Sequence, residues 1–156
     1  GAVQSRVEHA VNKALGVNAV VSILIGVLVT IMVQSSSITT SLLVPLAGAG
    51  LLRLERAFPV TLGANIGTTV TGFLAAMAVT GVNATAGLQI ALVHLFFNLS
   101  GTLMIYPISA VRNIPLRISR RITRLAVRSR RLTLACVALL FYGLPALAVL
   151  VSRILS

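Results

Sequence analysis

The sequence has almost no acidic side chains: its 156 residues contain two acidic residues in total, against thirteen Lys and Arg residues. Both acids are glutamates, Glu8 and Glu55, which lie far apart in the sequence, so a pair of catalytic carboxylates is not indicated. No Asp is present to orient a histidine beside a nucleophilic serine, which disfavours a serine hydrolase. The single cysteine, Cys136, cannot form a disulfide within the chain. These absences argue against an enzyme.

Charge of either sign is missing from three long stretches of the chain. Hydrophobic residues make up 57% of the sequence and charged residues only 10%, whereas a soluble domain has nearer 25% charged residues. The uncharged stretches are residues 14–52, 57–111 and 132–152. Each is longer than the roughly 18 residues that a helix needs to span a bilayer. We therefore expect an all-α integral membrane protein.

The net charge of +11 is concentrated between the second and third of these stretches. Eight basic residues lie there: Arg112, Arg117, Arg120, Arg121, Arg124, Arg128, Arg130 and Arg131. Nucleic-acid binding is the alternative interpretation, but no aromatic residue offers a stacking surface within this segment. A basic segment between two membrane-length runs is typical of a cytoplasmic loop next to anionic lipid headgroups. We expect residues 112–131 to form this loop and no nucleic acid to bind.

A cytoplasmic location for residues 112–131 fixes the expected direction of the other segments. A helix over 84–110 would run toward the cytoplasm, and a transmembrane helix over 132–152 would leave it again. The segment 57–80 would then rise from the cytoplasmic side. Basic residues flank both ends of the run 14–52, so this run would enter the membrane and return as a helical hairpin. Residues 1–13 would form a cytoplasmic amino-terminal segment.

The hairpin would turn at a polar tetrapeptide, Gln34, Ser35, Ser36 and Ser37. In hydrocarbon an unsatisfied amide or hydroxyl costs several kcal/mol, so such a cluster must face protein or a watery cavity. One of the serines can cap the returning helix by accepting from an amide of its first turn. The tip would then present hydroxyls, an amide side chain and the positive end of a helix dipole.

A second polar interruption contains Gly63, Asn65, Gly67, Thr68 and Thr71. Two glycines around an Asn weaken an apolar helix and favour a backbone break there, with free carbonyls. Many secondary transporters bind ions where such a broken helix faces a polar hairpin tip. The alternative is that Gly63 and Gly67, four residues apart, form a close helix-packing face.

These polar motifs closely resemble those of the type II sodium-dependent phosphate cotransporters. The similarity extends over about residues 20–150, and the order and spacing match the second of that family's two inverted repeats. The segments that carry it are residues 34–37, 54–59, 61–69, 88–91, 94–98 and 106–108. The resemblance implies sodium-coupled symport of inorganic phosphate by alternating access, with residues 14–111 as the transport repeat.

The resemblance also implies which residues bind the substrate and the ion. The hairpin-tip motif falls on Gln34, Ser35, Ser36 and Ser37, and the motif of the broken helix falls on Asn65, Thr68 and Thr71. Sodium, as a co-transported ion and not a cofactor, would be held by Gln34, Ser35, Thr68 and Thr71. The sequence contains one Gln-Ser-Ser-Ser motif where the family has two. We therefore expect half of a site, completed by the other repeat or a second protomer in a bacterial inner membrane or a plasma membrane. A structural subunit of a membrane complex and a carrier or channel for another small anion are the alternatives.

Overall fold

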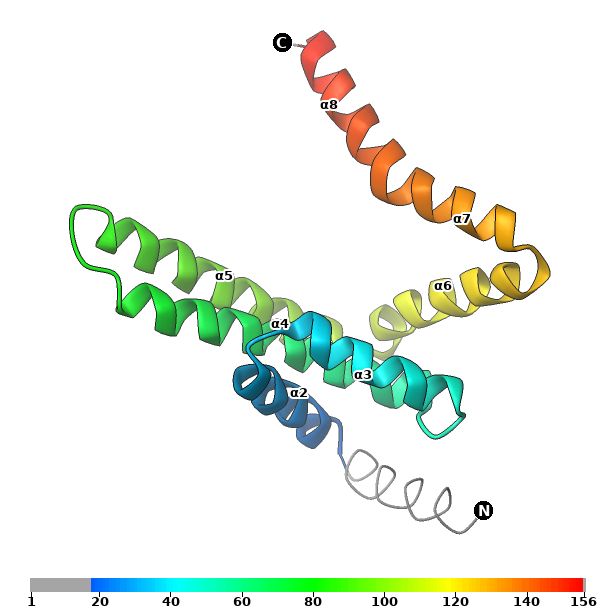
Figure 1. The fold of residues 1–156 in the computed structure, drawn as a ribbon, viewed down its shortest axis with the longest axis horizontal. Helices are drawn as coiled ribbons and strands as arrows, with labels where there is room; N and C mark the ends of the chain where they lie inside the picture. Colours follow the sequence, from blue (N-terminus) through cyan, green and yellow to red (C-terminus); the bar gives the residue numbers. More distant parts are fainter. Residues whose placement is uncertain (1–17, 156) are drawn as a thin grey trace. The chain divides into compact units, whose positions relative to one another are not determined.

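The computed structural model describes residues 18–155, and Figure 1 shows that they form helices joined by short turns, with no strand among them. The expected segment 1–13 and the first residues of the hairpin lie outside this range. The chain divides into two compact units, with the boundary after Arg112. The elements are α2 (Ala19–Val33), α3 (Ser36–Gly48), α4 (Leu54–Met77), α5 (Ala84–Ile105), α6 (Ser109–Arg128), α7 (Arg130–Ala138), the π-helical segment η1 (Leu139–Gly143) and α8 (Leu144–Leu155).

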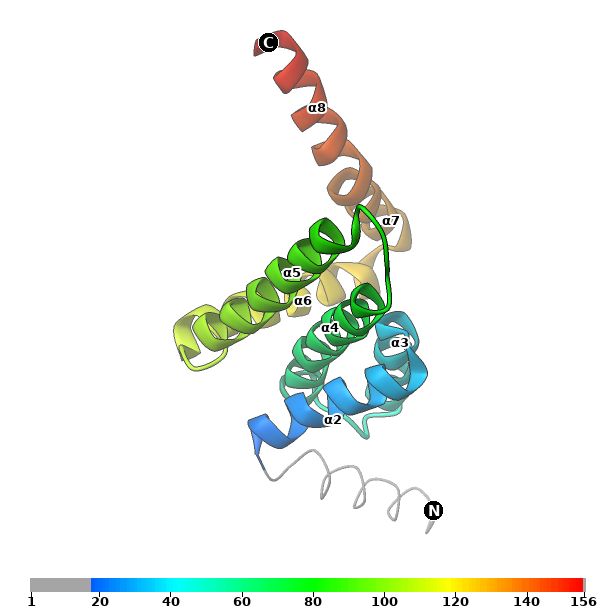
Figure 2. The same ribbon diagram turned by 90° about the vertical axis from the view of Figure 1, so that its left-hand side faces the viewer.

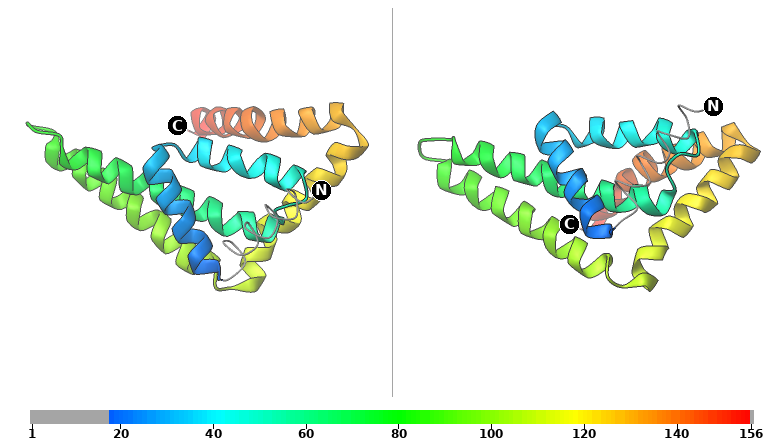
Figure 3. Two further views of the ribbon diagram at one scale, coloured as in Figure 1. Left: turned by 60° about the horizontal axis from the view of Figure 1, so that its bottom comes forward. Right: turned by 90° about the horizontal axis from the view of Figure 1, so that it is seen from below.

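Helices α2 and α3 are joined by a two-residue turn and diverge from it, as Figure 3 shows. Helix α2 ends at Gln34, which has a left-handed backbone with φ 55°. The Ser35 hydroxyl then accepts from the backbone N–H of Ile38 at 3.3 Å, which confirms that a serine caps the returning helix. With 15 and 13 residues, the two helices are about 22 and 20 Å long. Each is shorter than the roughly 30 Å hydrocarbon layer of a bilayer.

Helix α4 is continuous from Leu54 to Met77, so the expected backbone break at Gly63 and Gly67 is wrong. Both glycines are buried against α2 instead. A Cβ atom added to Gly63 would overlap the backbone carbonyl oxygen of Ile23, and one added to Gly67 would lie 2.8 Å from Cβ of Thr30. The packing alternative therefore holds at this position. The glycines allow two helix backbones to approach closely and do not open one of them.

Helix α2 presents a matching row of small residues to α4. Ser22, Gly26 and Thr30 are four residues apart, so they share one face of the helix, and all three are buried. A Cβ atom on Gly26 would overlap the carbonyl oxygen of Val60 on α4. The Thr30 hydroxyl also donates to the Thr39 hydroxyl of α3 at 2.9 Å, in a buried hydrogen bond. This threonine thus joins α2, α3 and α4.

Helix α4 is the central element of the unit that ends at Arg112. Figure 2 shows α2 and α3 on one side of it and α5 along the other. Helices α4 and α5 are antiparallel, and their far ends are joined by the turn at residues 79–83. Near the other end, the ring of Tyr106 stacks on that of Phe58 at a centroid distance of 6.5 Å, and the Arg112 guanidinium lies 5.1 Å from the Tyr106 centroid.

Residues 113–155 contain most of α6 and the long helical stretch α7–η1–α8. The segment 112–131, expected as a loop between two spans, is thus largely helical. The π-helical turn η1 ends just before Pro145, which lacks an amide hydrogen and disturbs a regular α-helical ladder. Three helices in the described part of the chain are long and apolar enough to cross a membrane: Leu54–Ala78, Ala84–Ile105 and Arg130–Ile154.

Candidate functional site

A polar pocket opens over the middle of α4, between the start of α3 and the adjacent face of α5. It has a volume of about 280 Å³. Five polar side chains line it: Ser36, Asn65, Thr68, His94 and Asn98. Apart from His94, these side chains carry no ionisable group. The pocket is unusual for its surroundings, because α4 and α5 are two of the three membrane-length apolar helices.

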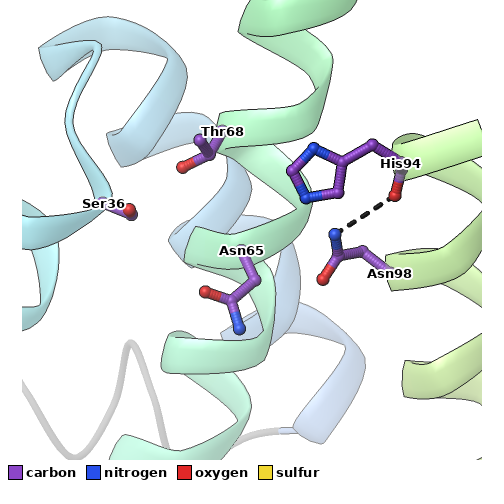
Figure 4. Close-up of a pocket in the computed structure, with 5 residues that line it drawn as sticks. All are labelled: Ser36, Asn65, Thr68, His94 and Asn98. Carbon is purple, nitrogen blue, oxygen red and sulfur yellow. Dashed lines mark hydrogen bonds between the residues drawn. The ribbon is translucent and has the colours of Figure 1, made fainter. Parts of the chain in front are cut away.

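Figure 4 shows how the three contributing helices place these groups. Ser36 is the first residue of α3, and its hydroxyl is directed toward the α4 residues. Asn65 and Thr68 lie one turn apart on α4, and both side chains are exposed in the pocket. From α5, the side chains of His94 and Asn98 approach from the other side, and the Asn98 amide nitrogen donates to the backbone carbonyl of His94 at 3.2 Å.

Local hydrogen bonds determine what the α4 hydroxyls can do. The Thr68 hydroxyl donates to the carbonyl oxygen of Ala64 at 3.1 Å, and the Thr71 hydroxyl donates to the carbonyl of Thr68 at 2.8 Å. A hydroxyl has one hydrogen to donate, so each of these oxygens offers its lone pairs to any further partner. They are therefore suited to bind a cation or accept a hydrogen bond.

The amino-terminal turn of α3 offers hydrogen-bond donors, in contrast to the acceptor oxygens on α4. Its Ser35 cap accepts from the third amide of the helix, at Ile38. The first amides of a helix, here those of Ser36 and Ser37, have no acceptor within the helix. Together with the helix dipole they form a positive end, which favours an anion. Ser36 brings this end of α3 to the pocket.

The structure brings together three of the seven residues predicted to bind substrate or ion, namely Ser36, Asn65 and Thr68. The other four do not line this pocket. Gln34 and Ser35 form the turn between α2 and α3. Ser37 is exposed, and its carbonyl accepts from the Thr40 hydroxyl at 3.2 Å. Thr71 lies nearly one turn beyond Thr68 on α4.

Two residues of the pocket, His94 and Asn98, were not among the predicted ligands. A lone histidine in an apolar helix is usually a packing residue, so the sequence alone does not assign a binding role to His94. Yet His94 is exposed on α5, and it shares a helix face with Asn98 because the two are four residues apart. A pair of polar residues at this spacing in an otherwise apolar helix is the signal that would have identified them.

Comparison with known proteins gives a consistent assignment. A family model described as Na+/Pi-cotransporter matches residues 1–148. Human sodium-dependent phosphate transport protein 2B is 44% identical over 124 residues, which are 80% of this chain and 18% of the human protein. The rat 2B protein is 48% identical over 109 residues, 70% of this chain and 16% of that protein. Sheep sodium-dependent phosphate transport protein 2A is 40% identical over 126 residues, 81% of this chain and 20% of the sheep protein.

These relatives are transport proteins and not enzymes. No solved structure matches the chain. The chain spans about a fifth of the length of the curated relatives that it matches. The family match covers nearly all of the chain, and three of its helices are long and apolar enough to span a membrane. The chain belongs to the Na+/Pi-cotransporter family of integral membrane transport proteins.

Proposed function

We propose that this chain supplies half of the binding site of a symporter that moves inorganic phosphate together with sodium by alternating access. The observation that carries the proposal is the pocket that joins Ser36, at the positive end of α3, to Asn65 and Thr68 on α4. It combines donors for an anion with oxygen ligands for a cation. The relatives described as sodium-dependent phosphate transport proteins supply the identity of the two ions.

Phosphate would bind at the α3 side of the pocket. Ser36 offers a hydroxyl, and the first-turn amides of α3 point toward the same end of the helix. Discontinuous and hairpin helices in secondary transporters present their amino-terminal ends to anionic groups in this manner. The asparagine side chains of the lining add amide hydrogens as further donors.

Sodium would bind at the α4 side. The Thr68 oxygen has its hydrogen committed to the carbonyl of Ala64, so its lone pairs remain for a cation. The Asn65 side chain adds an amide oxygen one turn away. Such neutral oxygens are the ligands that transporters use for sodium. The continuous helix α4 supplies side-chain oxygens and not the unwound carbonyls that the sequence suggested.

The composition of the lining gives a reason for coupling. No Lys or Arg lines the pocket, so a doubly charged phosphate there would lack a fixed positive partner. Charges in a site of low polarity are costly unless they are paired. A sodium ion on Asn65 and Thr68 would supply that partner and would itself be stabilised by phosphate. Each ion thus lowers the free energy of binding of the other.

Half of a site is proposed because the sequence contains one Gln-Ser-Ser-Ser motif. In inverted-repeat transporters the substrate lies at the interface of two related halves near the middle of the membrane. The exposed lining residues Asn65, Thr68 and His94 would face the second half, supplied by another repeat or another protomer. This arrangement would complete the coordination of both ions.

Uptake of radiolabelled phosphate into proteoliposomes tests the proposal. The vesicles would contain this chain together with a polypeptide carrying the other repeat, with and without an inward sodium gradient. We expect uptake that depends on sodium. Thr68→Ala should raise the sodium concentration for half-maximal uptake about tenfold, because losing one oxygen ligand is worth about 1.4 kcal/mol.

Thr61→Ala is the matched control, because Thr61 is on the same helix and its hydroxyl also donates to a backbone carbonyl, that of Phe58 at 2.7 Å. Thr61 does not line the pocket, so the sodium dependence should stay unchanged. Equal effects of the two substitutions on the sodium dependence would mean that Thr68 does not bind sodium. Uptake that does not depend on sodium would indicate a carrier or channel for small anions. No uptake under any gradient would indicate a structural subunit.

A further inference from the structure

Helix α6 is strongly amphipathic, unlike the other long helices of the chain. Its apolar residues recur at intervals of three and four, which places them on one face. The members of this face are Val111, Ile114, Ile118, Ile122 and Leu125. Ile114 is 48% exposed and Ile118 is 52% exposed. A helix of 20 residues therefore carries a partly exposed apolar stripe in the most basic part of the chain.

Arginines line one flank of this stripe. Arg117, Arg121, Arg124 and Arg128 recur with the same three- and four-residue spacing, and all four are exposed. Two of them form a small hollow with the apolar stripe: Ile114, Arg117, Ile118 and Arg121 surround a volume of about 150 Å³. The hollow thus has an apolar wall and a cationic rim.

The two arginines of the rim need a counter-ion. Like charges four residues apart on a helix repel each other, and α6 contains no acidic residue. The Nε atom of Arg117 donates to the carbonyl of Asn113 at 3.2 Å. A guanidinium has four further N–H groups that can donate to another partner. The two non-bridging oxygens of a phosphodiester group can accept paired hydrogen bonds from one guanidinium.

The position of α6 in the chain indicates where such a group would come from. The helix follows the membrane-length helix Ala84–Ile105 and precedes Arg130–Ile154. A short segment between two membrane spans is held at the membrane surface. Amphipathic helices with arginines beside an apolar face lie in that interface, with the apolar face toward the acyl chains.

We propose that α6 lies in the membrane interface and that Arg117 and Arg121 bind the phosphate group of an anionic lipid, with Ile114 and Ile118 inserted beside its acyl chains. The ligand is a lipid headgroup and not the transported ion. This interaction is separate from the transport pocket, whose lining residues belong to α3, α4 and α5. It would make the carrier sensitive to the anionic lipid content of its membrane.

The chain has no tryptophan, so the fluorescence of a single introduced tryptophan reports the surroundings of that position alone. Ile118→Trp places it on the apolar stripe, and Thr123→Trp places it on the polar side as a control. The full chain would be reconstituted in phosphatidylcholine vesicles and in mixtures with phosphatidylglycerol, using lipids with brominated acyl chains as quenchers. We expect quenching at position 118 that increases with phosphatidylglycerol, and little quenching at position 123.

Charge substitutions then separate headgroup binding from burial alone. In the Ile118→Trp background, Arg117→Gln with Arg121→Gln should weaken the phosphatidylglycerol-dependent docking roughly thirtyfold. Quenching should then fall to its level in pure phosphatidylcholine. Arg117→Lys with Arg121→Lys keeps the charge but loses the paired hydrogen bonds, so it should retain part of the effect.

Three outcomes would overturn the proposal. Equal quenching at positions 118 and 123 would mean that the stripe does not face lipid. Quenching unaffected by phosphatidylglycerol or by the Gln variants would mean that the arginines do not bind its headgroup. Finally, inorganic phosphate added to pure phosphatidylcholine vesicles should not reproduce the effect, and if it does, the arginines bind the free ion instead.

Discussion

Gln34 is the residue on which the geometry of the polar turn depends. It is the one described residue other than glycine with a positive φ, 55°. For a residue with a Cβ atom the left-handed conformation costs roughly 1–2 kcal/mol. The conformation ends α2 and turns the chain so that Ser35 can cap α3. A glycine would do this more easily, so the presence of Gln suggests a use for its side chain.

Substitutions at Gln34 can separate these backbone and side-chain roles. Gln34→Gly favours the turn, and we expect it to be about 1 kcal/mol more stable to unfolding in detergent than Gln34→Ala. If the amide oxygen binds sodium, both variants should raise the sodium concentration for half-maximal phosphate uptake by a similar factor. Normal sodium dependence in Gln34→Gly would show that Gln34 acts through the backbone alone.

At the scale of single residues, the sequence predicted some members of the pocket and the cap of α3 and missed other members of the pocket, for physical reasons. A serine before an apolar run is a strong capping signal, so the role of Ser35 could be expected from local sequence. Ser36, Asn65 and Thr68 were expected from their polarity within apolar runs. His94 and Asn98 were missed because a single polar side chain in a helix has many packing explanations, and only the adjacency of α4 and α5 brings the pair to the pocket.

At the scale of elements, the crossing of α2 and α4 determines the hairpin's position. Ser22, Gly26 and Thr30 meet the glycine-containing face of α4 so closely that a Cβ atom on Gly26 or Gly63 would overlap a backbone carbonyl. Without water to drive association, membrane helices rely on such close packing and on hydrogen bonds like that from Thr30 to Thr39. This contact holds the tip of the hairpin against the middle of α4.

The same crossing explains why the break in α4 was predicted wrongly. A pair of glycines in an apolar helix is compatible with a backbone break and with close packing against another helix. The residues around the glycines do not show which of these two structures forms. The deciding feature lies elsewhere in the chain, in the small residues of α2 at four-residue intervals. The number and order of the apolar helices were predictable because they depend on length and hydropathy alone.

A pair of alanine substitutions on α4 tests the packing role. Gly63→Ala introduces a methyl group that overlaps the Ile23 carbonyl, and we expect it to lower the free energy of unfolding by about 1–3 kcal/mol. Gly72→Ala is the control, since a Cβ atom there has nothing within 4 Å. It should be neutral or slightly stabilising, because alanine favours helix over glycine. Denaturant titration of both variants in detergent measures the difference, and equal stabilities would exclude close packing at Gly63.

At the scale of the whole molecule, charge is distributed unevenly among the connections between spans. The turn between α4 and α5, residues 79–83, contains no charged residue, whereas α6 and the start of α7 contain eight arginines with Arg112. Basic connections remain in the cytoplasm. One membrane-length helix, α5, separates the two connections, so they should lie on opposite sides of the bilayer. A bias this strong favours a single orientation and disfavours a dimer of oppositely inserted copies.

Cysteine labelling in intact cells tests this orientation. After Cys136→Ala removes the single native thiol, Asn83→Cys and Thr123→Cys each introduce one at an exposed position. Neither substitution removes an arginine. We expect a membrane-impermeant maleimide to react with position 83 from outside and with position 123 only after permeabilisation. The opposite pattern would reverse the topology. Reaction of both positions from the same side would mean that α5 does not cross the membrane, and the pocket that it shares with α4 could not then lie at the depth that alternating access requires.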